Sequence, residues 1–130
     1  MKSKYGFGKT VSYSFKDTLE KVKKELEKEG FGILTEIDVA ATLKRKLNQE
    51  MPPYLILGAC NPQFAHRVLE VDPSIGLLLP CNVVVRQDDN GSVHVEFMDP
   101  DAVLELVDQL KIDIIAKEVR QRLERVMEAL

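Results

Sequence analysis

The only two cysteines in the sequence stand in the motifs GACNP and LPCNV, and each is followed directly by an asparagine. Thiols are soft metal ligands and nucleophiles, and a side-chain amide both donates and accepts hydrogen bonds. If the strands that carry the two motifs are neighbours, both Cys-Asn pairs flank one pocket at the end of a sheet. The predicted ligand-binding residues are therefore Cys60, Asn61, Cys81 and Asn82.

Cys60 precedes a predicted helix N-terminus, because Asn61 is a strong N-cap residue and Pro62 is favoured at the first helical position. The partial positive charge of a helix N-terminus lowers the pKa of a thiol beside it. We therefore expect Cys60 to be the more exposed and more reactive cysteine, and Cys81 to be mainly structural. The alternative is that Cys60 is a small buried side chain next to a cap.

His66 is the imidazole nearest to Cys60 in the sequence, about one helical turn into the predicted helix. With the two thiols it makes a candidate metal site of Cys60, His66 and Cys81, for which zinc is the candidate ion. The spacing of the cysteines matches no recognised zinc pattern, and no fourth ligand is evident. Cys60 could instead be the nucleophile of a thiol-dependent enzyme, but few ionisable residues accompany it. We therefore name no catalytic residue.

Two other motifs do not support a site. The stretch GFGKT at residues 6–10 resembles part of a phosphate-binding loop, but the full pattern needs glycine at position 3, where the chain has Ser3. No Ser-His-Asp arrangement is visible, because neither of the two histidines accompanies a serine in a supporting motif.

The length of 130 residues indicates a single domain over residues 1–130. The net charge of −3 argues against nucleic acid as a partner. The longest apolar stretch, residues 75–81, is too short to cross a membrane. Because the N-terminus lacks the apolar segment of a signal peptide, we expect a cytoplasmic protein with free thiols.

Alternating and continuous apolar runs predict strands at residues 5–15, 31–38, 54–59, 77–87 and 92–98. Helices are expected after the capping residues Ser14, Asp38, Asn61 and Asp99. The C-terminal region is expected to be helical, with a break near residues 109–113. This pattern predicts an α+β fold: a mostly antiparallel sheet of about five strands, helices packed on one face and a long C-terminal helix. A doubly wound parallel sheet is the alternative.

The turn between the last two strands decides which side chains face the core. A three-residue loop with Gly91 in the left-handed conformation gathers the valines of both strands on one face, whereas a two-residue turn mixes them with Glu96 and Met98. A slip of one residue exposes the whole core face, so we choose the three-residue loop. The predicted pairs are Val83 with Phe97 and Val85 with Val95.

In this register Cys81 faces the core, while Asn82 and His94 lie on the opposite face of the sheet. That opposite face is too apolar for a purely solvated surface, with Leu78, Val84 and Met98 among its members. A half-apolar sheet face in a small domain is typical of a subunit interface. We therefore expect a homodimer that uses this face or the C-terminal helix.

Five motifs, YGFGKTV, EGFGILTEIDV, GACNP, LLLPCNVVV and MDP, resemble in this order the bacterial and archaeal family of domains of unknown function numbered 302. The resemblance covers essentially the whole chain. It implies a single compact α+β domain, often described as dimeric, with no settled activity. The family pattern falls on Gly58, Cys60, Asn61, Pro62, Leu79, Pro80, Cys81 and Asn82.

We expect a dimeric module that binds a small molecule or a metal ion through the GACNP and LPCNV region. A thiol-dependent enzyme with Cys60 as its nucleophile is one alternative. A pure protein-interaction domain, which uses the second face of the sheet, is the other.

Overall fold

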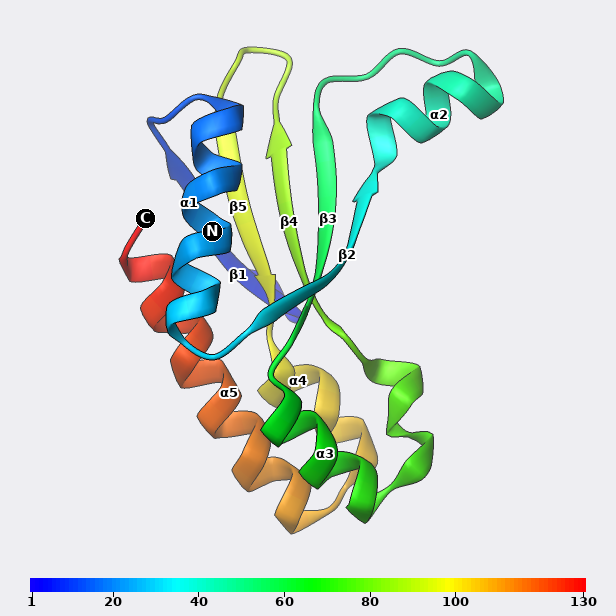
Figure 1. Ribbon diagram of the computed structural model, residues 1–130, viewed down its shortest axis with the longest axis vertical. Coiled ribbons are helices and arrows are strands. Elements are labelled where there is room, and N and C mark those ends of the chain that lie inside the picture. The colour runs from blue at the N-terminus through cyan, green and yellow to red at the C-terminus, as the bar shows by residue number, and fades with distance from the viewer.

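A five-stranded sheet in the order β1-β5-β4-β3-β2 forms the centre of the computed structural model, which describes all residues 1–130 (Figure 1). Every neighbouring pair of strands is antiparallel. The predicted α+β fold is confirmed, and the doubly wound parallel alternative is wrong. The strands are β1 (Gly6–Val11), β2 (Gly32–Asp38), β3 (Tyr54–Cys60), β4 (Cys81–Gln87) and β5 (Val93–Met98).

The helices fall into three groups (Figure 1). α1 and α5 lie on one side of the sheet and cover a hydrophobic core of 22 buried residues, while α3, α4 and η1 gather at one end of the sheet. α2 stands away from the body and buries none of its residues. The bounds are α1 (Phe15–Lys28), α2 (Val39–Leu47), α3 (Pro62–Val71), η1 (Pro73–Leu78), α4 (Pro100–Leu104), η2 (Glu105–Val107) and α5 (Leu110–Glu128).

The helices begin at the caps that the sequence predicts. A side-chain oxygen accepts a hydrogen bond from a backbone N–H of the first turn in each of four helices, at Ser14, Asp38, Asn61 and Asp99. Such a bond satisfies an N–H that has no partner within the helix. The expected break in the C-terminal region is also present, because Asp108 has a φ of 54° and α5 begins two residues later.

The hairpin register is confirmed, and with it the division of the sheet into two faces. Val83 pairs with Phe97 and Val85 with Val95, and Gly91 has a φ of 89° in the turn. A glycine adopts this left-handed conformation without the clash that a Cβ causes. The paired valines are fully buried beneath the helices, and the uncovered side of the sheet is called the open face below.

The segment before β4 differs from the prediction. Residues 73–78 form the 3-10 helix η1 and not the start of a strand, and Leu77 is 88% exposed although a strand would have turned it toward the core. The physical reason lies in two prolines. Asp72 caps a helical turn that begins with Pro73, and Pro80 has no N–H to donate to a strand ladder. Leu78 packs against the core from η1, so its predicted place on the open face is also wrong.

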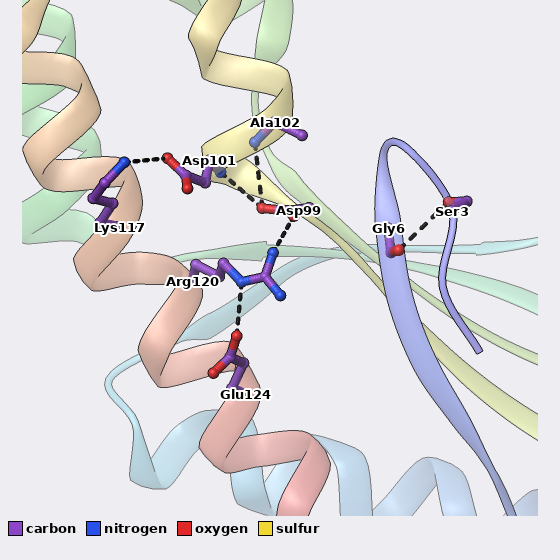
Figure 2. A network of polar contacts seen from close by, with 8 residues as sticks. All are labelled: Ser3, Gly6, Asp99, Asp101, Ala102, Lys117, Arg120 and Glu124. Atoms are coloured by element: carbon purple, nitrogen blue, oxygen red, sulfur yellow. Dashed lines mark hydrogen bonds and ion pairs between the residues drawn. The ribbon is translucent and has the colours of Figure 1, made fainter.

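A polar cluster joins α4 to α5. Arg120 bonds both Asp99, the cap of α4, and Glu124 on its own helix, and Lys117 bonds Asp101 (Figure 2). The Arg120 guanidinium also lies 4.8 Å from the centre of the Phe7 ring. Because these contacts hold the N-terminal end of α4, they help to position the buried Pro100 and Leu104 of that short helix at the end of the sheet.

No helix of the structure has both the length and the apolar composition that are needed to cross a membrane.

Candidate functional site

A cavity of about 330 Å³ lies where β3 ends and β4 begins. Its walls come from β2, β3, β4, α3, η1, α4 and α5, and 13 of the 17 residues that line it are hydrophobic. Phe64, Val68 and Leu104 form part of its buried wall, while Leu34 and Leu69 are more exposed. No charged side chain lines it. Such a cavity favours an uncharged, apolar molecule over an ion that keeps its water shell.

The cavity brings the two cysteines together. The β3–β4 register pairs Ala59 with Cys81, so Cys60 is the next residue along β3, and both thiols line the cavity. Both are free thiols, Cys60 partly exposed and Cys81 buried. The expectation that Cys60 is the more exposed cysteine is therefore confirmed.

The acidity expected for Cys60 is wrong. Burial raises its pKa above the ordinary thiol value, although α3 begins immediately after it. Burial, and secondarily repulsion by the Cys60 thiolate, raise the pKa of Cys81 to about 12. Loss of solvation in the apolar cavity disfavours the charged thiolate form of both cysteines. Both thiols are therefore protonated at neutral pH.

Asn61 also lines the cavity, and it is 9% exposed. Its Oδ1 accepts a hydrogen bond from the backbone N–H of Phe64 at 3.5 Å, which is the capping role predicted for it. Asn82 lies elsewhere. It is exposed on the open face, where it lines a second hollow with Tyr54 and Val84. Three of the four predicted ligand-binding residues thus share one cavity, and Asn82 does not.

The motif GACNP has a further structural use. A Cβ on Gly58 would collide with the side-chain oxygen of Thr35 and would lie 3.0 Å from the ring of Pro80. Only glycine lets these two groups cross the strand so closely. Gly58 therefore allows Pro80, part of the cavity wall, to pack against β3.

His66 does not form a set of metal ligands with the two thiols. Its side chain is 75% exposed and contacts Glu70 of the same helix at 3.0 Å. Nowhere in the chain do three or more His, Cys, Asp or Glu side chains come together as metal ligands. The helix turns His66 outward, while the cavity-lining side chains of α3 are at positions 64, 65, 68 and 69. The structure therefore offers two thiols but no three-residue site for zinc.

The open face carries a polar chain that sequence patterns did not reveal. His94 is buried, its Nδ1 lies 2.8 Å from Oγ1 of Thr10, and its Nε2 lies 2.6 Å from a carboxylate oxygen of Asp88. Arg86 donates to both Asp88 and Glu96. Arg86 lies opposite His94, as the confirmed hairpin register requires, but Thr10 arrives from β1, whose pairing with β5 no local motif indicates.

The Thr10–His94–Asp88 order resembles a catalytic triad, yet the surroundings do not fit one. None of the three principal cavities is lined by any of these residues, and Thr10 is exposed at the edge of the sheet. Triad catalysis needs a substrate pocket and oxyanion donors beside the nucleophile. We therefore interpret the chain as a structural network that satisfies a buried imidazole.

Comparisons with known proteins agree with this fold. The sequence matches the model of the family described as "Domain of unknown function DUF302" over residues 7–130. The structure is similar to the crystal structure of an uncharacterized conserved DUF302 protein from Bacillus stearothermophilus, with 29% sequence identity, a TM-score of 0.90 and 98% of each chain covered. No curated protein matches the chain. The similarity spans both cysteine motifs and all walls of the cavity.

The raised thiol pKa values predict slow alkylation at neutral pH. Cys60 should react faster than Cys81 because it is more exposed, and neither rate should level off below about pH 8.5, the ordinary thiol pKa. Iodoacetamide rates for each cysteine, followed by mass spectrometry from pH 6 to pH 10, measure this. A rate for Cys60 that levels off near pH 7 would show that the helix N-terminus dominates after all.

Asp88 should make the free energy of unfolding depend on pH in the acidic range. Its pKa is lowered, first by the hydrogen bond with His94 and then by the charges of His94 and Arg86. A carboxyl whose pKa is lower in the folded state adds stability that is complete above the unfolded value, about 3.9, and is lost as the pH falls through the folded value. Asp88→Asn should therefore reduce the loss of stability below about pH 4.

Urea unfolding between pH 2.5 and pH 7 measures this contribution. Asp89→Asn is the matched control, because Asp89 is an exposed neighbour in the same turn. The prediction is contradicted if Asp88→Asn and Asp89→Asn change the pH profile equally.

Proposed function

This chain belongs to the DUF302 family of domains of unknown function, and we propose that it is a binding protein for a small, uncharged, largely apolar molecule. The molecule occupies the cavity at the end of the sheet, with Cys60, Asn61 and Cys81 at its polar end. The observation that carries this proposal is a preformed concave site with an apolar lining and only a few polar groups, which is typical of small-molecule sites.

The size of the cavity limits the ligand. A cavity of about 150 Å³ lined by apolar side chains takes up one benzene molecule. At about 330 Å³ this cavity is roughly twice as large, which suits a molecule with two fused or linked rings, or a branched chain of similar bulk. A larger ligand would have to extend past the exposed Leu34 and Leu69.

Binding is favoured over thiol catalysis by the state of the two cysteines. A thiol nucleophile needs a lowered pKa or a base beside it. Burial raises the pKa of both thiols, and the only imidazole of α3, at His66, points to solvent and contacts Glu70. As neutral thiols, Cys60 and Cys81 act as polarisable, weakly polar lining groups.

Filling the cavity should abolish binding. Ala65 lines it and is only partly buried, so Ala65→Phe places a ring in the cavity without removing a core side chain. Naphthalene is a suitable probe, because the chain contains no tryptophan and the fluorescence of naphthalene can be followed directly. We expect saturable binding to the unmodified protein and at least about tenfold weaker binding, or 1.4 kcal/mol, to Ala65→Phe.

Ala41→Phe is the matched control, because Ala41 is exposed on α2, outside the cavity, and the residue change is the same. Naphthalene-2-sulfonate should bind more weakly than naphthalene, since no charged side chain lines the cavity. Equal binding of naphthalene to both variants would refute the proposal.

Self-association through the open face is a second candidate function. The hollow on this face is lined by Tyr54, Val84 and Met98, and Tyr5 at its edge is 71% exposed. Sedimentation at about 100 μM, well above the Kd of typical stable interfaces, should give the mass of a dimer. Val84→Lys should give a monomer, whereas Ile114→Lys, at an exposed position of α5, should not. A monomer for Ile114→Lys together with a dimer for Val84→Lys would show that the interface lies on the C-terminal helix instead.

A further inference from the structure

We infer that Cys60 and Cys81 together form a two-thiolate site for a soft monovalent metal ion of the Cu(I) type. The site lies at the sheet end of the cavity and includes neither His66 nor any other imidazole or carboxylate. This inference goes beyond the proposed binding of an apolar molecule and does not depend on it.

The geometry of two paired strands carries the inference. Ala59 and Cys81 are direct partners in the β3–β4 ladder, and Cys60 follows Ala59 at the last position of β3. Residues that face each other across an antiparallel pair have Cα atoms about 4.5–5.5 Å apart, and Cys60 lies one residue beyond the direct partner of Cys81. Strict alternation would send the two side chains to opposite faces, but the cavity extends around the end of β3 and is lined by both.

The number of ligands selects the ion. A structural zinc site needs four ligands, and a catalytic one needs three from the protein. No group of three His, Cys, Asp or Glu side chains exists in this chain, so the cavity cannot complete a zinc site. Thiolates are soft ligands that select Cu(I), and Cu(I) is stable with only two of them in a linear arrangement. An apolar wall that excludes water suits such an ion, because it needs no further oxygen ligand.

Positive charge close to the two cysteines would stabilise the Cu(I) complex, which is an anion. Binding replaces two S–H bonds by two S–Cu bonds, releases two protons to solvent and leaves a complex with one net negative charge. Burying that charge is costly unless positive charge lies nearby. The N-terminus of α3 follows Cys60 directly. Arg122 does not line the cavity, but its guanidinium lies 5.0 Å from the centre of the Phe64 ring, which does. One of its terminal nitrogens donates to the Glu29 carbonyl, and its buried Nε has no hydrogen-bond partner.

Anaerobic titration with Cu(I) against a chromogenic Cu(I) chelator tests the site in the full chain. We expect one ion per chain and two protons released per ion. Cys60→Ala and Cys81→Ala should each weaken binding by more than about 100-fold, which is the largest loss expected when a residue only supports a metal ligand through a hydrogen bond. His66→Ala should bind as the unmodified protein does, and Zn(II) should not bind in stoichiometric amounts.

Unchanged affinity in either cysteine variant would overturn the inference, as would one ion per two chains, which indicates thiols shared between molecules. Cys81 is buried, so Cys81→Ala could fail to fold, and a second reagent covers that outcome. Phenylarsine oxide reacts with two adjacent thiols to form two S–As bonds and one water. It should protect both cysteines of the unmodified protein from alkylation and should not protect Cys81 in Cys60→Ala. Failure to protect the unmodified protein shows that the sulfurs cannot be bridged.

Discussion

The pairing of β4 with both of its neighbours is the constraint on which the rest of the structure depends. β4 joins β3 to β5, and its register places Val83 and Val85 in the core and Cys81 beside Ala59. A slip of one residue would turn these valines outward and would carry Cys81 away from the cavity. The core, the cavity and the division into two faces therefore share one cause. The left-handed Gly91 in the turn stabilises that register locally.

The cavity exists because the chain leaves the sheet at this point. β3 ends at Cys60 and enters α3 through Asn61, while η1 and Pro80 hold back the start of β4. α4, whose cap Asp99 is bonded to Arg120 of α5, closes the same end of the sheet. Three short elements thus meet around apolar side chains without filling the space between them. Burial in that space also determines the chemistry of the thiols, because desolvation opposes ionisation of both.

The open face shows how a buried polar group is accommodated on a sheet. His94 is buried, but both ring nitrogens have partners, and Asp88 and Arg86 extend the network toward solvent. These bonds satisfy groups that would otherwise be costly to bury. Beside this network the same face carries a half-apolar hollow lined by Tyr54, Val84 and Met98. The two faces thus differ, because one packs against α1 and α5 and the other carries the polar network.

Sequence alone determined the features that depend on neighbouring residues. The four caps, the Gly91 turn and the α+β class follow from local chemistry and from alternation along single strands, the family follows from the resemblance of its motifs, and each is observed. Tertiary structure decided the rest. The direction of His66, the place of Asn82 outside the cavity and the meeting of Thr10 with His94 all depend on which strands pair and where they end. The pKa of Cys60 is raised, whereas the sequence predicted that it would be lowered. The solvation of a thiol depends on every element packed around it, whereas a cap depends on only three or four residues.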